Sequence, residues 1–362
     1  MNIEIKTLEA CRELRDTWNA LLSHDSPHIQ TPGISMTYEW TESLAETRLK
    51  NELIHVYIAR DKNEITAILP VYKKQKNRYL YQEKNLSQVA ELYATRNGLI
   101  RKSTASSINI ISSIIEKNDI ASFKLTTCNP EDNEAITNYL TQSGTSYTST
   151  QHIISAWKKL PENRDDILNT LEKKFRYTIR TSIKGLEQTG RLTFKTITHE
   201  NESADFLSDV YEIERASWKE EAGTSITKNQ YQQDFYNSFI PKSAKRGWLR
   251  GAIIYLDNEP FAHSINIVFN GVCECLKTSF KEKYKQYSPG HLIDYMVFLD
   301  LHDNKLMLFD YLGIIEPSKR KWTKDSYIQT QHTIYSSSIT GKLASTYSVL
   351  EKYRAEKTRS FT

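Results

Sequence analysis

The 362-residue sequence predicts an α/β protein in which one structural unit occurs twice. The two segments that suggest this are HVYIARDKNEITAILPVY (55–72) and GAIIYLDNEPFAHSINIV (251–268). Both are typical of two strands joined by a turn rich in Asp, Asn and Glu. Each is followed by a helical pattern and a further strand, as a tandem duplication would give. Because the match is one of pattern and not of identity, chance similarity of two hairpins is the alternative.

The second copy continues into a strand–helix–strand unit between residues 272 and 312. Val272, Leu276 and Phe280 indicate a strand, and Ser288-Pro289-Gly290 indicates a helix start, with Ser288 as N-cap and proline at the first helical position. Apolar residues follow at helical spacing, and the second strand is Leu306–Leu312. Backbone N–H groups and the helix dipole converge at such a helix start and favour an anion. The unit is therefore predicted to hold a phosphate-bearing donor.

The remaining elements follow from hydrophobic periodicity and turn residues. The first part is predicted to contain strand Ile3–Thr7, helix Glu9–Ser23, a helix from Ser35 to about Ala45, strands Leu53–Arg60 and Ile65–Tyr72, helix Ser106–Lys117 and strand Phe123–Cys128. The second part is predicted to contain a helix within Asp165–Gly190 and strands Leu192–Ile197, Trp248–Tyr255 and Phe261–Phe269. The expected domains are residues 1–160 and 161–362.

Composition excludes several classes of protein. A hydrophobic fraction of 39% with 25% charged residues is ordinary for a globular protein, and a net charge of +4 is too small to indicate DNA binding. The four cysteines are scattered, and there is no H-E-x-x-H pattern, so neither a disulfide framework nor a metal site is predicted. No apolar run is long enough to span a membrane, and we expect a cytoplasmic protein.

The helix within Asp165–Gly190 has one apolar side and one basic side. Gly190 is placed as its C-cap. The basic side consists of Lys173, Arg176, Arg180 and Lys184. This side is either a solvated surface or a clamp for a phosphate-bearing donor or an acidic acceptor, held by charge-assisted hydrogen bonds.

Residues 214–226 carry the pattern E-x-x-x-W-K-x-x-x-G-T-x-I, in which Glu214, Trp218 and Lys219 come first. This segment resembles the cellulose-biosynthesis-type acetyltransferase family, a branch of the GNAT superfamily related to Fem-type peptidoglycan aminoacyl ligases. Other pieces match in order and together cover most of the chain: Tyr38-Glu39-Trp40, the basic helix from Arg176 to Leu186, Ser288-Pro289-Gly290, and Asp310-Tyr311-Leu312 with Lys319 and Trp322. The resemblance implies tandem GNAT-like domains of mixed sheets flanked by helices, the first degenerate and the second catalytic.

The resemblance also implies an acyl thioester as co-substrate, either acyl-CoA or an acyl-carrier protein, and no permanently bound cofactor. The donor-binding residues would be Tyr287, Ser288, Gly290, His291 and Leu292. Of the usual superfamily pattern Q/R-x-x-G-x-G/A, only Gly290 is present. Leu292 stands where a small residue would let the backbone approach a pyrophosphate. Gly313 lies one position earlier than the glycine of the family.

Acyl transfer to an amine requires a deprotonated amine, a polarised carbonyl and a proton for the leaving thiolate. His263 is a candidate base, although a histidine in an otherwise apolar strand is equally consistent with the core. Glu214 and Asp310 are the other candidates: Glu214 is otherwise a surface carboxylate, and Asp310 either acts as a base or orients Lys319. The predicted substrate-binding residues are Trp218, Lys219, Arg176, Arg180, Lys319 and Trp322, with packing as the alternative for the last two.

The function predicted is therefore transfer of an acyl group to an amine, or a hydroxyl, of a sugar, a polysaccharide precursor or an amino-acid-like metabolite. Two alternatives stay open. One is a Fem-type ligase that uses aminoacyl-tRNA, against which stands the lack of a long helical-hairpin pattern for tRNA. The other is a GNAT-like protein that binds a ligand without catalysis, which acyl-group turnover would exclude.

Overall fold

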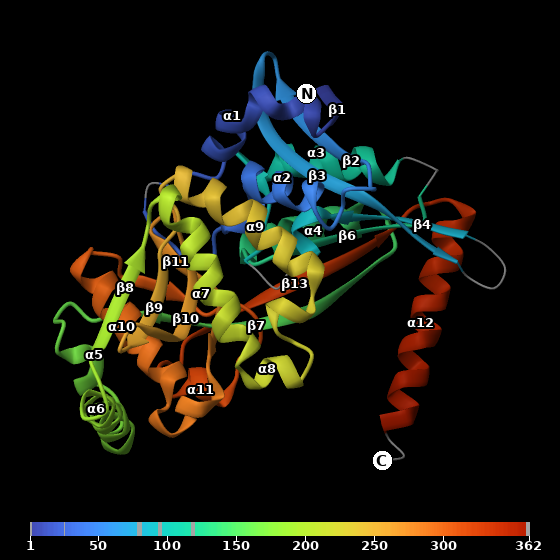
Figure 1. Ribbon diagram of the computed structural model, residues 1–362. Coiled ribbons are helices and arrows are strands. Elements are labelled where there is room, and N and C mark those ends of the chain that lie inside the picture. The colour runs from blue at the N-terminus through green and yellow to red at the C-terminus, as the bar shows by residue number, and fades with distance from the viewer. Residues whose placement is uncertain (1, 25, 78–81, 93–95, 117–119, 360–362) are drawn as a thin grey trace.

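The strands of this protein form one continuous sheet that joins two halves of the molecule (Figure 1). The computed structural model describes residues 2–24, 26–77, 82–92, 96–116 and 120–359. Within these residues the sheet has 13 strands in the order β1-β2-β3-β4-β6-β13-β7-β12-β11-β10-β9-β8, with β5 pairing to β3. Helices flank it, so the predicted α/β class with a mixed sheet is confirmed.

The two halves have the same strand topology. In the first, β1 (Asn2–Thr7), β2 (Ile54–Asp61), β3 (Glu64–Asn77) and β4 (Gln82–Gln88) are successive antiparallel neighbours. The chain then passes through α3 (Thr104–Ile115), and β6 (Ser122–Thr127) lies parallel to β4. In the second, the series is β8 (Leu192–Ile197), β9 (Gly251–Leu256), β10 (Glu259–Phe269), β11 (Val272–Phe280), α10 (Pro289–Asp303) and the parallel strand β12 (Leu308–Asp310). The expected duplication is present as a duplication of topology.

The last strand of each half inserts into the other half. β13 (Ser326–Tyr335), near the end of the chain, pairs with β6 of the first half, and β7 (Tyr147–Lys159) pairs with β12 of the second. β7 and β13 also pair with each other, and they run across the middle of Figure 1. The two halves therefore share their central strands. The predicted domain boundary between residues 160 and 161 falls directly after β7 and stays a prediction.

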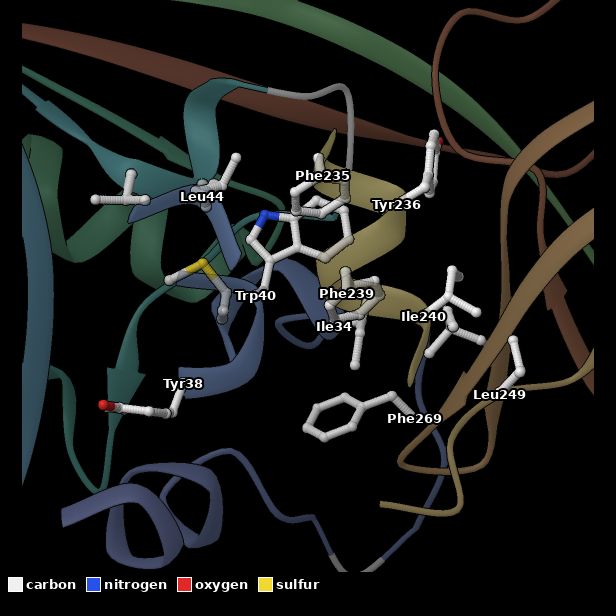
Figure 2. Close-up of a cluster of buried hydrophobic side chains, with 14 of the residues drawn as sticks. Ile34, Tyr38, Trp40, Leu44, Phe235, Tyr236, Phe239, Ile240, Leu249 and Phe269 are labelled. Atoms are coloured by element: carbon white, nitrogen blue, oxygen red, sulfur yellow. The ribbon is translucent and has the colours of Figure 1, made fainter. Parts of the chain in front are cut away.

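The two halves also share a hydrophobic core. Trp40 of α2 (Tyr38–Glu46) packs edge-on against Phe235 and Phe239 of α9 (Gln230–Lys245), with ring centroids 4.7 and 4.9 Å apart. Figure 2 shows these rings side by side, and the Tyr236 ring on the same helix lies edge-on to Phe235, with ring centroids 5.6 Å apart. Burial of aromatic rings in close contact is strongly stabilising. The first half thus supports a helix of the second half.

The other elements complete the layers around the sheet. They are η1 (Glu9–Leu14), α1 (Arg15–Ala20), η2 (Ile34–Met36), η3 (Val89–Leu92), β5 (Ile100–Arg101), α4 (Pro130–Gln142), α5 (Asp166–Asn169), α6 (Lys173–Glu187), η4 (Glu200–Glu202), α7 (Ser203–Arg215), α8 (Trp218–Glu221), η5 (Ile226–Lys228), η6 (Glu282–Tyr287), α11 (Pro317–Arg320) and α12 (Ile339–Arg359). None of the helices in the described part of the chain has the length and apolar character that a membrane span requires.

Three local predictions need correction. The strand expected over Leu306–Leu312 is only Leu308–Asp310, because Leu312 has a positive φ of 50° and turns the chain out of the sheet. Ser288 stands before α10 as expected, but with φ 48° it is left-handed and its side chain makes no cap hydrogen bond. The helix expected over Glu9–Ser23 is a 3₁₀ turn followed by the short α1.

Candidate active site

A cavity opens where β11 and β12 separate. These parallel strands pair only from Val272 and Leu308 to Glu274 and Asp310. Beyond that pair β12 ends, whereas β11 continues to Phe280. The cavity has a volume of about 640 Å³ and is lined by residues 275–280 of β11, by the start of α10 and by the loop 311–313. We call this opening the second splay.

A β-bulge shapes the same stretch of β11. Ile265 of β10 is opposite Lys277, whereas Asn266 is opposite Cys275, so Leu276 is the extra residue. A bulge interrupts the ladder and bends the strand. The side chains of β11 are thereby redirected at the point where the strand begins to line the cavity.

One end of the cavity lies at the start of α10. Ser288, Gly290 and His291 line this end, and their predicted role in donor binding stays a prediction. The Ser288 carbonyl accepts hydrogen bonds from the N–H groups of His291 and Leu292. A Cβ at Gly290 would lie 3.6 Å from the Phe280 ring, which is an ordinary contact distance. Gly290 therefore keeps a space open that small side chains would tolerate and long ones would fill.

The other two predicted donor residues lie outside the cavity lining. Leu292 is buried in the core beneath α10. Tyr287 packs on the basic helix α6. A Cβ built at Gly185 of that helix would lie only 2.9 Å from the Tyr287 ring. This contact places α6 beside the donor loop. Arg180 is exposed on α6, and Arg176 is partly buried, with its Nη1 donating to the Asn169 carbonyl.

His291 is oriented by an aromatic cluster. The Trp322 indole Nε1 donates to His291 Nδ1 at 3.2 Å, and the Phe175 ring lies edge-on to both rings. Burial lowers the pKa of His291 to about 4, so the imidazole is neutral. Trp322 is itself buried. Trp322 is not among the described residues that line the cavity, but it contacts His291, which is one of them.

The loop after β12 is held from both sides. The Asp310 Oδ1 accepts from the Leu312 N–H at 2.9 Å, and the Lys319 Nζ donates to the Leu312 carbonyl at 3.0 Å. Lys319 also bonds the Ile314 carbonyl. Asp310 and Lys319 are thus connected by their hydrogen bonds to the backbone of Leu312. Lys319 lines the cavity, whereas Asp310 is fully buried below it.

Asp310 belongs to a buried cluster of charges that includes Arg96 and Glu274. Arg96 Nη2 lies 3.0 Å from Glu274 Oε1, and Nη1 lies 3.5 Å from Asp310 Oδ2. The Tyr327 hydroxyl donates to the same Asp310 oxygen at 2.8 Å. Burial raises the pKa of Glu274 to about 7, although the Arg96 guanidinium acts to lower it. The Arg96 cluster connects a loop of the first half to Glu274 and Asp310, which are the last paired residues of β11 and β12 before the second splay.

The other end of the cavity is built by the segment with the E-x-x-x-W-K-x-x-x-G-T-x-I pattern. Glu214 Oε2 accepts from the Ile226 N–H at 2.9 Å, which closes the segment on itself. The Lys219 ammonium donates to the Thr278 carbonyl of β11, and Lys277 Nζ donates to the Thr224 carbonyl at 3.0 Å. The pattern therefore has a structural meaning, since it fastens a loop over the exposed part of β11. Trp218, which is 48% exposed, and Lys219 line the cavity.

Glu214 and His263 form a buried pair beneath this loop. His263 Nε2 lies 3.1 Å from Glu214 Oε1, and both side chains are fully buried. Burial lowers the pKa of His263, against the effect of the Glu214 carboxylate, so the neutral imidazole is favoured. Burial acts to raise the pKa of Glu214, but its hydrogen bond to His263 and the nearby lysines bring that pKa below its ordinary value. Neither residue is among those that line the cavity.

Sequence reasoning missed Asp294, Tyr311 and Lys277, which all line the cavity. Burial raises the pKa of Asp294 to about 7, and the Tyr311 hydroxyl lies 3.5 Å from its Oδ2. Asp294 stands one helical turn after Gly290, so helical spacing from the predicted donor loop would have found it. No cluster of three or more His, Cys, Asp or Glu that suits a metal ion occurs in the described ranges.

Comparison with known proteins agrees with this geometry. Residues 173–320 match the family model described as acetyltransferase (GNAT) domain. No curated protein matches the chain. Among solved structures, FemX is similar with a TM-score of 0.60 at 11% identity, over 91% of this chain and 97% of that chain. A conserved protein of unknown function from Bacteroides thetaiotaomicron is similar with a TM-score of 0.60 at 12% identity, over 92% and 100% of the two chains.

The C-terminal domain of a putative lysylphosphatidylglycerol synthetase from Agrobacterium fabrum is similar as well, with a TM-score of 0.55 at 10% identity over 89% of this chain and 92% of that chain. At such identities the likeness concerns the fold, and it extends over both halves. The matched residues 173–320 contain every part of the cavity wall except Trp40. The fold is the expected mixed α/β fold with two halves of one topology, it is shared with these structures, and residues 173–320 are similar to a GNAT acetyltransferase domain.

Proposed function

We propose that the protein transfers an acyl group from acyl-CoA, or another acyl thioester, to an amine at the second splay. The observation that carries this proposal is the cavity that runs along residues 275–280 of β11, from the start of α10 to Lys219. An extended thioester arm fits beside a strand whose neighbour has ended, where backbone N–H groups polarise the acyl carbonyl. The acceptor then enters from the end formed by residues 214–226.

The donor phosphates lie at the start of α10 in this proposal. Backbone N–H groups of the first helical turn and the helix dipole favour anions there. Lys285 lines the cavity at this end, and Arg180 is exposed on the neighbouring helix α6. Arg176 and Arg180 therefore serve as outer contacts for phosphate. A donor of this kind is a cytoplasmic metabolite, which fits a cytoplasmic location.

Asp294 is the proton acceptor that the cavity supports best. Its carboxyl lines the cavity, and its pKa of about 7 lets it take a proton from an amine near neutrality. The amine nitrogen bonds to the acyl carbon, the carbon–sulfur bond breaks, and the proton held by Asp294 passes to the leaving thiolate. His263 and Glu214 act in this scheme by holding the acceptor loop.

Two measurements test the proposal on the intact protein. Calorimetry should show binding of acetyl-CoA, and release of CoA thiol in the presence of amines should show turnover. Replacing Arg176 and Arg180 by Glu should raise KM for acetyl-CoA, and the increase should be larger at low salt because exposed charges are screened. Absence of both donor binding and thiol release would overturn the proposal.

A ligase that uses an aminoacyl donor carried on tRNA is the second candidate. The fold shared with FemX and the exposed basic face of α6 favour it. The two candidates differ in the donor and share the cavity. Replacing acetyl-CoA by aminoacyl-tRNA in the same turnover assay separates them, because only one of the two donors should be consumed.

A further inference from the structure

Two lysines, Lys219 and Lys277, line the acceptor end of the cavity, and one buried carboxylate, Glu214, lies near both. The Lys219 and Lys277 ammonium groups donate to neutral backbone carbonyls, those of Thr278 and Thr224. Glu214 is the buried carboxylate near both, and its oxygens are already bonded to the Ile226 N–H and to His263. Glu316, which acts on Lys219, also lines the cavity but is exposed to solvent. The described cavity lining carries four lysines (Lys219, Lys277, Lys285 and Lys319) and two carboxylates (Asp294 and Glu316), so positive charge is in excess.

The excess charge has an energetic cost. Burial lowers the pKa of both lysines, and the charge of Lys277 lowers the pKa of Lys219 further. Two ammonium groups in a partly buried site repel each other. An anion bound beside both would attract each of them and so offset that repulsion. The site is thus built to gain most from a negatively charged ligand.

We propose that Lys219 and Lys277 bind an anionic group, a carboxylate or a phosphate, on the amine acceptor. This inference rests on the acyl transfer proposed above and specifies its acceptor as an anionic amine. The indole of Trp218, which is 48% exposed, and Tyr236 line the same end of the cavity. They provide an aromatic surface on which the body of a sugar or an amino acid packs.

The same charges help the acceptor to react. An amine attacks only when it is neutral, and nearby positive charges disfavour its protonated form. A ligand anchored by its anion holds its amine beside two ammonium groups, which lower the pKa of that amine. The lysine pair thus both selects the acceptor and favours its nucleophilic form.

Two matched pairs of amines test the proposal with acetyl-CoA as donor. Glucosamine 6-phosphate is compared with glucosamine, and an α-amino acid with its amide, by release of CoA thiol. The anionic member of at least one pair should have a kcat/KM about 10–100-fold higher, as expected for hydrogen bonds to a charged group. The pair that shows the preference tells phosphate from carboxylate.

Variants Lys219→Met and Lys277→Met locate the effect. Each should lower kcat/KM for the anionic amine about 10-fold more than that for the neutral amine. Damage to the loop held by these lysines would instead lower both values equally. Lys195→Met, at an exposed residue of β8 paired with Glu202, is the matched control and should behave as wild type.

The results separate this inference from the proposed function. Equal use of charged and neutral amines, or equal losses in the variants, would overturn the anionic subsite and leave acyl transfer standing. Failure of acetyl-CoA to bind would overturn the proposed function itself. If acetyl-CoA binds but no test amine is acylated, calorimetry with the same four amines decides, and equal affinity of charged and neutral members overturns the inference.

Discussion

The two halves of the protein repeat one topology, but the second splay opens into a cavity of about 640 Å³, whereas a side chain occupies the corresponding place in the first half. In the first half, β4 and β6 pair as far as Ser87 and Lys124, just as β11 and β12 pair as far as Glu274 and Asp310. Beyond Ser87 the opening is filled. The Gln88 side chain donates to the Gly98 carbonyl at 2.8 Å and accepts from the Thr126 N–H at 3.3 Å. We call this filled opening the first splay.

The segment that fills the first splay also supports the second. Arg96 and Asn97 precede Gly98, and the Asn97 carbonyl accepts from the Cys128 N–H at 3.0 Å. From this position the Arg96 side chain reaches Glu274 and Asp310. In the first half, a structural contact with the second half thus takes the place that corresponds to the cavity. This topology alone therefore does not make a binding site. The residues that follow the last strand pair determine whether the opening is a cavity or is filled.

The largest effect is expected from filling the second splay at its donor end. Gly290→Glu places a long carboxylate in the space in front of Phe280, where it opposes a donor phosphate. Acetyl-CoA binding by calorimetry should be abolished, while the circular dichroism spectrum and Tm stay near wild type.

Gly290→Ala is the matched control for that variant. Its Cβ would make only an ordinary contact with the Phe280 ring, so the donor affinity should change little. If the donor affinity of Gly290→Glu is unchanged, the start of α10 is not part of the donor site. The second splay would then have no donor-binding role that distinguishes it from the first.

The next effect concerns proton transfer in the second splay. In the proposed mechanism Asp294 accepts a proton only when it is deprotonated, so kcat/KM should rise with pH through its pKa of about 7 and then level off. Asp294→Asn should lower the rate about 10²–10⁴-fold and remove this acidic limb, with acetyl-CoA binding intact.

His263→Gln separates the two candidate bases in the same pH series. The pKa of His263 is lowered from 6.5, so a limb caused by His263 would lie below that value. We expect His263→Gln to lower Tm and to leave the limb near pH 7 in place. A limb below pH 6.5 that disappears in His263→Gln would return the role of base to His263.

Sequence patterns predicted β11 and α10 at the second splay, because local signals define them, but they predicted β12 too long. Pro289 and Gly290 fix the start of α10, and the apolar stripe fixes its length. The same patterns did not predict which side chains line the cavity. Asp294 and Lys277 gain their roles from the separation of β11 and β12, which depends on pairing between residues far apart in the sequence. Gln88 was missed because only its contacts with Gly98 and Thr126 reveal the first splay.

The contact between the two splays is tested by removing the charge that spans them. Arg96→Met leaves Glu274 and Asp310 buried without their counter-charge, which should cost about 3–5 kcal/mol in free energy of unfolding. Chemical denaturation measures this loss. Arg60→Met, which breaks a partly exposed ion pair with Glu4, should cost less than about 1 kcal/mol. Equal losses in the two variants would show that the Arg96 cluster does not support the second splay.

The smallest effect is expected from the residue that fills the first splay. Gln88→Leu keeps a similar volume but leaves the Thr126 N–H and the Gly98 carbonyl without the bonds they make to that side chain. Such a loss should lower the free energy of unfolding by about 2 kcal/mol. Because Gln88 lies in the half that lacks the donor loop, kcat/KM and acetyl-CoA affinity should stay within about twofold of wild type when measured well below Tm. A loss of donor affinity in Gln88→Leu, or a second equivalent of bound acetyl-CoA, would show that the first splay is also a ligand site, and the contrast between the two halves would fail.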